Sequence, residues 1–497
     1  MKLVSYGRLR IDGRANTVMS KNRFLKILLP SIALTFGTQA NAYTIHEAVA
    51  HSLATSPDFL ISTNVRDEVD KQLRESYAGY LPSVDMTAGM GQQYTNNATT
   101  RADTGFNGAN FTATGGTLVN PVSALGTTTM TRTEFGLTAS QMLFDGFAVY
   151  HDVEGHKARV RAQAWRVNSS AQDTAIDVIQ AYLNVLQFRE QVANTRENLN
   201  TIERIYGQIQ KRSEGGIGRK ADLDQAEARV ALARVNHVKQ QALLRDAETE
   251  FLRFVGIPVP ANLVVPETPQ GFPISENAAI EQGLKCHPEF RASIEDVDVT
   301  RNEYKGVRAS FVPRLDLQLG HTRNHNVDGN QGDSDDNTAM LRARWNLFRG
   351  GKDLATICEK ASKMQEAQEV SNRAQRQVVE KVRLDWNTYK SAADALPALK
   401  DHVDSSVKTR DAYQKQFNIG QRTLLDLLDS ENELFGARQD YIEGKYKRIA
   451  GQYRVMNATG DLTRSVGVML PRQAEPRPTG VMDGAMKFFD KTSTLFD

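Results

Sequence analysis

The stretch AGYLPSVD at residues 78–85 decides the fold, because a related stretch, ASFVPRLD, returns at residues 309–316, which is 231 positions later. In both places a proline opens a run in which polar and apolar residues alternate. Other blocks return in the same order: SPDF at 56–59 as HPEF at 287–290, LFDG at 143–146 as LFRG at 347–350, and IG at 217–218 as IG at 419–420. The offset falls by 27 between residues 90 and 131, where the first copy carries a longer loop. We interpret this ordered self-similarity as an internal duplication.

Each copy has the same predicted plan of two strands followed by a long helical hairpin. The Pro-rich segment between the copies has no helical or strand period and is interpreted as a linker. The predicted segments are a first repeat at 43–258 with strands 81–94 and 132–146 and a helical hairpin at 148–256, a linker at 259–274, a second repeat at 275–470 with strands 312–325 and 339–349 and a helical hairpin at 352–458, and a loosely ordered tail at 471–497.

The N-terminal 42 residues have the layout of a secretory signal peptide. Lys21 and Arg23 precede an apolar run at 24–37, and the small-x-small triplet Ala40-Asn41-Ala42 follows it. Residues 1–42 are therefore predicted to be a signal peptide, with Met1 or Met19 as its start. After Ala42 no apolar stretch is long enough to cross a bilayer as a helix. The mature chain is expected to work outside the cytoplasm.

The four predicted strands alternate strictly between apolar and polar residues. In the first strand, Val84, Met86 and Met90 alternate with polar or small neighbours, and Leu341 and Ala343 do the same in the fourth. This pattern suits strands with one face in lipid and the other in water. A soluble antiparallel sheet with one face on a core shows the same pattern. The membrane interpretation is favoured because no other β-rich region is available to cover these apolar faces.

Four strands cannot close a barrel, and an open sheet edge in lipid leaves backbone groups without hydrogen bonds. If these strands enter a membrane, several copies must share one barrel. Two copies would give eight strands and a filled interior, whereas three would give twelve and leave a lumen. The predicted fold class is therefore mixed α+β: a trimeric β-barrel with four strands per chain, continued into a long α-helical coiled-coil barrel, with each chain internally duplicated.

The helical stretches are far longer than those of globular domains. Residues 148–213 contain no proline and would span about 100 Å as one helix. Pro397 predicts a kink or a short break in the equivalent helix of the second copy. A coiled-coil stalk or surface adhesin is the alternative that helical periodicity alone leaves open. Hairpins that continue from barrel strands, however, would form a wall and not a rod.

No motif of a catalytic, metal or cofactor site is found in the sequence. His46 and His51 are five apart where a zinc-binding HExxH helix requires four, and His151 and His156 share this spacing. The acidic segment 328–336 lacks the glycine and closing glutamate of a calcium loop and is interpreted as a solvated loop, as is 96–129. The chain is expected to be no enzyme, to hold no metal or cofactor and, with a net charge of +2, to bind no nucleic acid.

The two cysteines are expected to be free and buried. Cys286 lies about 24 residues before its strand and Cys358 about 9 residues after the next one. Along helices this places them at depths that differ by roughly 20 Å. A disulfide cannot bridge such a distance.

From Tyr43 to Val468 the chain resembles the TolC family of outer-membrane channel-tunnels. The most specific element is FNIGQRTLLDLLDSEN at 417–432, and the phrases SQMLFDGF at 140–147, GRKADLDQAE at 218–227 and LDSENELF at 428–435 resemble the type I secretion branch. The resemblance implies a homotrimer in the outer membrane of a Gram-negative bacterium, in contact with its lipid, with a tunnel in the periplasm. It also implies an inner-membrane ABC transporter or other pump and a periplasmic adaptor as partners. Multidrug efflux remains the alternative to protein secretion, since the sequence of a channel does not identify the cargo that it exports.

Within the 417–432 element, Asp426 and Asp429 are three apart at the start of a returning helix and so share one face. Threefold symmetry would gather their carboxylates around one axis, where they would repel one another and attract cations. The alternative is that both acids only favour the helix macrodipole. Arg422 and Asp224 resemble the family's latch between neighbouring hairpins. Phe417 departs from the tyrosine of the family's latch, which removes the hydroxyl that this link uses.

Overall fold

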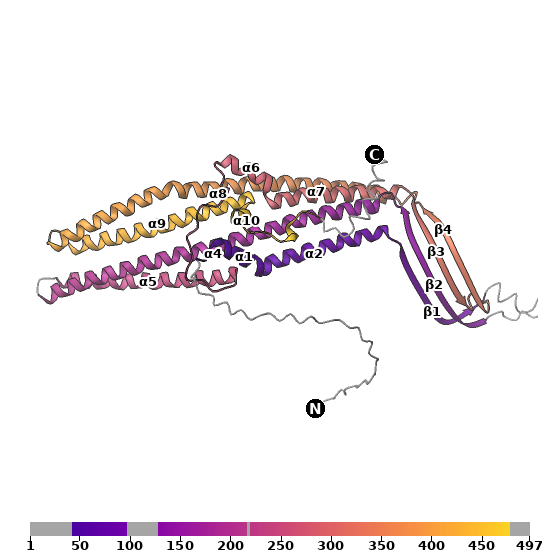
Figure 1. The fold of residues 1–497 in the computed structure, drawn as a ribbon, viewed down its shortest axis with the longest axis horizontal. Helices are drawn as coiled ribbons and strands as arrows, with labels where there is room; N and C mark the ends of the chain where they lie inside the picture. The colour runs from indigo at the N-terminus through magenta and orange to yellow at the C-terminus, as the bar shows by residue number, and fades with distance from the viewer. Residues whose placement is uncertain (1–41, 97–127, 216–218, 478–497) are drawn as a thin grey trace, which may run out of the picture. The chain divides into compact units, whose positions relative to one another are not determined.

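The computed structural model describes residues 42–96, 128–215 and 219–477. The predicted signal peptide up to residue 41 and nearly all of the predicted loop 96–129 lie outside the described residues. Figure 1 shows the elements in chain order. The helices are α1 Ile45–Thr55, α2 Pro57–Tyr77, α4 Ala148–Glu214, α5 Lys220–Val255, α6 Glu276–Cys286, α7 Pro288–Val307, α8 Lys352–Asn418, α9 Leu424–Thr459 and α10 Leu462–Ser465, and the strands are β1 Ser83–Thr95, β2 Thr128–Phe144, β3 Arg314–His325 and β4 Asp333–Arg344.

The four strands form one antiparallel sheet in the order β1-β2-β3-β4. The β2–β3 pair joins the two repeats, with Ala139 opposite Leu319. β1 and β4 are therefore the two edges of the sheet. In β1 the apolar side chains are open to solvent, with Val84 64% and Met90 81% exposed. On the opposite face Asp316 of β3 is buried and accepts hydrogen bonds from the guanidinium groups of Arg314 (2.9 Å) and Arg344 (2.8 Å).

The fourth strand differs from its prediction. β4 begins at Asp333 and ends at Arg344, so residues 345–349 lie beyond it and the acidic segment 333–336 lies within it. Asp333 is opposite His325 and hydrogen-bonds to its ring at 2.8 Å, while Asp335 pairs with Arg323 at 3.6 Å. Cross-strand charge pairs thus extend the hairpin into a segment that was interpreted as a loop.

The two helical hairpins have equal dimensions. α4 and α8 contain 67 residues each, and α5 and α9 contain 36 each. Both returning helices end on a glycine in the left-handed region, Gly256 (φ 85°) and Gly460 (φ 80°), which are 204 positions apart. The offset of 204 therefore holds through both hairpins. Pro397 lies inside α8, which continues through it without the predicted break.

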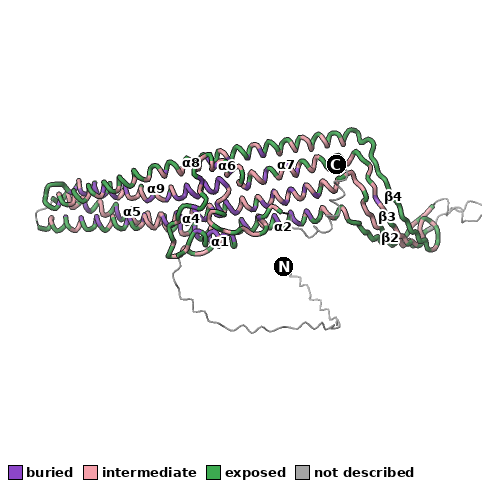
Figure 2. Tube along the Cα trace, turned by 45° about the horizontal axis from the view of Figure 1, so that its top comes forward, coloured by how far each residue is buried: buried purple, intermediate pink, exposed green. Residues whose placement is uncertain are grey.

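The two long helices have very different surroundings. α4 packs against α5 of its own hairpin, against α2, and against α7 and α9 of the second repeat. As a result 24 of its residues are buried, whereas only 7 residues of the equally long α8 are buried. Figure 2 shows this contrast, with buried segments gathered along α4 and α9 and an exposed face along α8. The core of the chain therefore lies along the junction of its two halves.

The linker and the beginning of the tail pack against this core. The Tyr182 hydroxyl of α4 lies 2.7 Å from the carbonyl of Tyr43 and accepts a hydrogen bond from the amide of Val264 at 2.9 Å. Ala474 is buried, and its carbonyl accepts a hydrogen bond from Asn168 of α4 at 2.7 Å. The loose order predicted for 471–497 is therefore wrong for residues 471–477, and the rest of the tail lies outside the described residues.

The cysteine prediction is confirmed in one respect and wrong in another. Both thiols are free, but Cys286 is half-buried and Cys358 is exposed. Cys358 lies on α8, whose open face leaves it uncovered in one chain. Of the helices described in the structure, none is both long enough and apolar enough to cross a membrane.

The C-terminal glycine of α9 generates a stability prediction. A Cβ at Gly460 would lie 2.7 Å from Cα of His287 and 2.9 Å from the carbonyl oxygen of Cys286, whereas a Cβ at Gly420 (φ 78°) would meet open space. Gly420→Ala should cost about 1–2 kcal/mol of left-handed strain. Gly460→Ala should cost a further amount of about 1–3 kcal/mol, because the backbone must shift. Urea unfolding in detergent, followed by circular dichroism, measures both; equal costs would contradict the close approach.

Candidate functional site

The candidate gate residues lie at the turns between the hairpin helices, at the opposite end of the helices from the sheet (Figure 1). At this end a hydrophobic cluster joins the two hairpins. Phe417, at the end of α8, is 5% exposed and packs within it. The other buried members are Ile202, Ile205, Ile209, Ala226, Ala233, Leu424, Leu427 and Leu428.

Asp426 forms part of a capping box at the start of α9. Its carboxylate accepts hydrogen bonds from the hydroxyl (2.8 Å) and backbone amide (3.2 Å) of Thr423, while its own amide donates to that hydroxyl. The Thr423 hydroxyl, followed by its amide and the Arg422 guanidinium, lowers the pKa of Asp426 below the ordinary carboxyl value. The carboxylate is therefore charged at neutral pH, and it stabilises the first turn of α9.

Asp429 lies one turn further along α9 and carries a different contact. Its carboxylate accepts a hydrogen bond from the Arg229 guanidinium of α5 at 3.2 Å, and its side chain remains 59% exposed. An exposed pair of this kind contributes little to stability. Asp429 is thus partly neutralised by the neighbouring hairpin while it stays accessible to solvent and ions.

The three predicted latch residues are not brought together within one chain. Arg422 lies over the Tyr413 ring at 4.2 Å and pairs with Asp426 at 3.8 Å. Phe417 is buried beneath the guanidinium of Arg212, 4.8 Å from the ring centroid. Asp224 is exposed on α5 and forms no ion pair with any residue that the structure describes.

The helix starts identify a further acid at the tip. Asp426 is the third residue of α9, and the third residue of α5 is Asp222. Asp222 is therefore the first-repeat equivalent of Asp426 by position in the helix, whereas the block IG at 217–218 had aligned Asp224 with it. The two-residue difference arises because the IG blocks of the two turns are 202 positions apart, whereas the helices that follow them begin 204 positions apart. Arg229 and Arg212 were not identified from sequence, since only the packing of the hairpins brings them to Asp429 and Phe417.

The histidines weighed as metal ligands have other partners. His46 and His51 each place Nδ1 against a backbone carbonyl, that of Val466 (3.0 Å) and that of Val255 (2.9 Å). Within the described ranges no group of three or more histidine, cysteine or acidic side chains could hold a metal ion.

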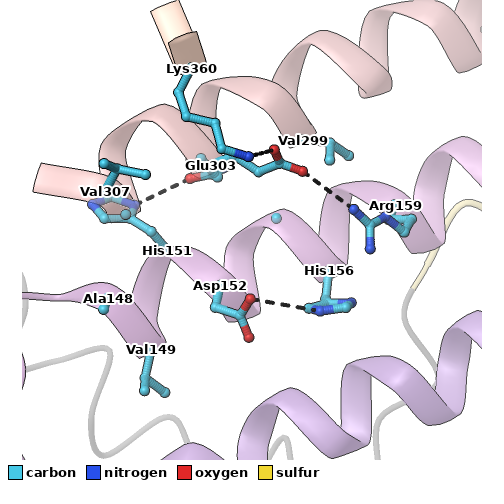
Figure 3. Close-up of a pocket in the computed structure, with 13 residues that line it drawn as sticks. Ala148, Val149, His151, Asp152, His156, Arg159, Val299, Glu303, Val307 and Lys360 are labelled. Carbon is cyan, nitrogen blue, oxygen red and sulfur yellow. Dashed lines mark hydrogen bonds and ion pairs between the residues drawn. The ribbon is translucent and has the colours of Figure 1, made fainter. Parts of the chain in front are cut away.

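A cavity near the sheet end of α4 contains the other histidine pair, as Figure 3 shows. His156 faces Asp152 at 3.8 Å, and the ring of His151 contacts Asn302 at 3.3 Å. Burial lowers the pKa of His151, so this ring is neutral at pH 7. Glu303 is held between Lys360 (2.7 Å) and Arg159 (3.5 Å). These contacts join α4, α7 and α8 and give the cavity a structural role at the junction of the two halves.

Comparisons with known proteins agree with this architecture. The family model described as outer membrane efflux protein matches residues 48–256 and 279–461. The chain is 25% identical over 332 residues to outer membrane efflux protein BepC of Brucella suis, covering 66% of this chain and 72% of BepC. It is 26% identical over 337 residues to alkaline protease secretion protein AprF of Pseudomonas aeruginosa, covering 66% and 69%. The solved CmeC outer membrane channel of Campylobacter jejuni superposes with a TM-score of 0.70 at 14% identity, covering 90% of this chain and 89% of CmeC.

The fold and these matches define the class of protein, an outer-membrane channel component built of long helices and a four-stranded sheet. The chain belongs to the outer membrane efflux protein family. The resemblance to the TolC family is thereby confirmed, as is the outer membrane of a Gram-negative bacterium as its location. Its relatives are channel proteins and not enzymes.

The burial of Phe417 predicts a local loss of stability when its ring is removed. Phe417→Ala should destabilise the tip by about 3–5 kcal/mol, because a fully packed ring leaves a cavity. Ile419→Ala is the matched control, since Ile419 is 69% exposed two residues away. Hydrogen exchange of amides in the last turns of α8 and the first turns of α9 measures the change. Equal protection in the two variants would show that the ring does not hold the tip.

Proposed function

We propose that three copies of this chain form a passive export duct, in which twelve strands close one barrel and the helical hairpins form a tunnel across the periplasm. The observation that carries the proposal is the sheet, whose two long edges are open and whose apolar face is exposed. In lipid both edges require hydrogen-bonding partners, and pairing β1 of one copy with β4 of the next supplies them. Three copies satisfy closure and leave a lumen.

We propose that Asp426 and Asp429 form an acidic gate at the closed end of the tunnel. Three copies would gather six carboxylates near one axis, where they favour cations over anions and bind divalent cations. The depressed pKa of Asp426 supports a ring that stays charged at neutral pH. Because Arg229 contacts Asp429, a change in hairpin packing would alter the exposed charge of the ring.

Closure of the gate requires bonds between copies that oppose this repulsion. Arg422 and Asp224 are both exposed and do not pair with each other within one chain. To bridge to Asp224 of a neighbouring hairpin, Arg422 would exchange its 3.8 Å contact with Asp426 and its hydrogen bond to Gln416. Phe417 is turned into the core under Arg212 and lacks a hydroxyl, so in this chain it supports the tip by packing. The latch we propose is thus formed by Arg422 and Asp224 without the contribution of a tyrosine.

A duct without an energy source requires a pump. We propose that the chain is the outer-membrane part of a tripartite system with an inner-membrane ABC transporter or other pump and a periplasmic adaptor. The similarity to AprF, described as an alkaline protease secretion protein, favours type I protein secretion. The similarity to BepC, described as an efflux protein, favours small toxic compounds as the alternative cargo. Deletion of the gene distinguishes them by loss of a secreted protein or by increased sensitivity to toxicants.

Planar-bilayer recordings test the duct and its gate together. The purified chain should run as a heat-modifiable trimer and form cation-preferring channels that divalent cations block. Asp426→Asn combined with Asp429→Asn should weaken the cation preference and raise the blocking concentration about tenfold, because the ring loses its charge. Asparagine keeps a side-chain acceptor for the α9 cap, so the helix start is preserved.

Asp246→Asn is the matched control, since it removes an exposed acid from α5 at a distance from the hairpin tip. This variant should retain the selectivity of the unmodified channel. An unchanged selectivity and unchanged divalent block in the double variant would exclude the carboxylate ring, and absence of any channel would exclude the duct.

A further inference from the structure

The turn between β3 and β4 has a backbone bend at each of its ends. β3 ends at His325 and β4 begins at Asp333, so residues 326–332, the mouth loop, join them at the end of the sheet away from the helices (Figure 1). Asn326 (φ 56°) and Gly332 (φ 113°), the first and last residues of the mouth loop, have positive φ angles. Asparagine and glycine are residue types that tolerate such angles. The bends are therefore encoded in the sequence of the loop.

Hydrogen bonds within the mouth loop give it a defined shape. The Asn326 amide donates to the Gly332 carbonyl at 3.0 Å, and the Gly332 amide donates to the Asn326 side chain at 2.9 Å. At the tip, Asp328 (φ 53°) and Gly329 (φ 84°) both have positive φ, and a backbone hydrogen bond of 3.0 Å closes the turn around them. This is the pattern of a type I′ turn, for which Asp-Gly is a preferred sequence.

The mouth loop lies against β2 and reaches β1. The Asn326 side chain donates a hydrogen bond to the carbonyl of Thr131 in β2 at 3.1 Å. The Asp328 amide donates to the side-chain oxygen of Gln93 in β1 at 3.3 Å, and the Gln93 amide group donates to the Asp328 carboxylate at 3.2 Å. β1 lies two strand spacings from β3, or about 10 Å. The loop therefore crosses the whole width of β2.

Arg132 of β2 is the electrostatic link between the mouth loop and the sheet. Its guanidinium donates a hydrogen bond to the Gln93 side-chain oxygen at 3.0 Å and lies 3.5 Å from the Asp328 carboxylate. It also pairs with Glu134 of its own strand. The Arg132 side chain is 33% exposed and that of Asp328 is 68% exposed, so solvent weakens their attraction. The attachment is specific in geometry and modest in strength.

These contacts place the mouth loop over the polar face of the sheet. Arg132 is opposite Gly91 and Glu134 is opposite Gly89, so their side chains share one face. Successive residues of a strand point to opposite faces, which puts Gln93 on that face and Met90 on the other. The loop thus covers the face that carries the charged residues and leaves the apolar face open.

We propose that the mouth loop is a lid that narrows the outer opening of the duct, held in place by Gln93 and Arg132. The inference rests on the proposed duct, in which the polar face lines the lumen, and it goes beyond that duct by adding a second constriction. The candidate gate lies at the tips of the helical hairpins, whereas the mouth loop lies at the far end of the sheet. The two constrictions would close the lumen at its opposite ends.

The strength of the ties sets how the lid works. Three copies would bring three mouth loops to the rim of the lumen, each folded across its own β2. Exposed polar contacts cost little to break, so cargo that leaves the lumen can displace the loops. The type I′ tip and the hydrogen bonds between Asn326 and Gly332 do not involve the sheet, so the loop keeps its shape when it moves. The ties re-form once the cargo has passed.

Labelling of intact cells from outside tests the lid. Thr87 is exposed on the polar face of β1, opposite Gly136 and four residues nearer the helices than Gly91. In a Cys286→Ser, Cys358→Ser background, a small maleimide should label the Thr87→Cys variant, whereas a large polymer-linked maleimide should label it only slowly. Asn330→Cys, on the exposed tip of the mouth loop, is the reference that both reagents should label quickly.

Release of the lid should change only the reaction with the large reagent. Gln93→Ala combined with Arg132→Ala should raise the rate at which the large maleimide labels Thr87→Cys about tenfold, because loss of the ties shifts the loop toward its open state. Arg342→Ala is the matched control, since Arg342 belongs to the same face at the helix end of β4, opposite Asp316. This control should leave both rates unchanged.

The outcomes separate the lid from the duct. If the large reagent labels Thr87→Cys as quickly as Asn330→Cys before any release, the lid is wrong and the duct stands. An unchanged slow rate in the Gln93→Ala, Arg132→Ala variant shows that these two residues do not hold the opening narrow. A Thr87→Cys variant that neither reagent reaches in a trimer whose Asn330→Cys site is labelled would exclude a water-filled lumen, and with it the duct itself.

Discussion

Burial of α4 is the constraint on which the rest of the described structure depends. A helix of 67 residues cannot be stabilised by its own hydrogen bonds alone, so its apolar stripe must be covered along the whole length. The first repeat covers one side with α2 and α5, and the second repeat covers the other with α7 and α9. The position of the strands follows, because β2 leads into α4 and brings β3 beside it.

The same constraint identifies α8 as the long helix that one chain leaves largely uncovered. α8 has the length of α4 and, like α4, begins after a residue in the left-handed region, yet its open face carries exposed residues such as Leu354 and Leu384. In the trimer we propose, the next copy would pair the open edges of the sheet, and the exposed face of α8 is a second surface that one chain leaves uncovered. The gate we propose would belong to the same arrangement, because Asp429 touches α5 of its own chain and would face its counterparts across the axis.

Sequence alone indicated the duplication, the alternating strands and the helical hairpins, because these depend on local period and on repeated blocks. It did not define the start of β4, since the charge pairs of Asp333 and Asp335 with the opposite strand overcame their preference for a loop. It also missed the contacts of Arg229 and Arg212, which exist only once the hairpins pack together. The IG motif shared by the two turns had made Asp224 the equivalent of Asp426, whereas the starts of α5 and α9 make Asp222 its equivalent.

The linker that joins the halves has a thermodynamic consequence for assembly. Val264 of the linker donates a hydrogen bond to the Tyr182 hydroxyl of α4. Because the linker joins the two halves covalently, each half is at a high effective concentration for the other. In the trimer we propose, six similar units would form the ring, and half of the contacts between them would be intramolecular. In the proposed trimer only three bodies, instead of six, would lose translational and rotational freedom when the ring closes, which lowers the entropic cost of closure.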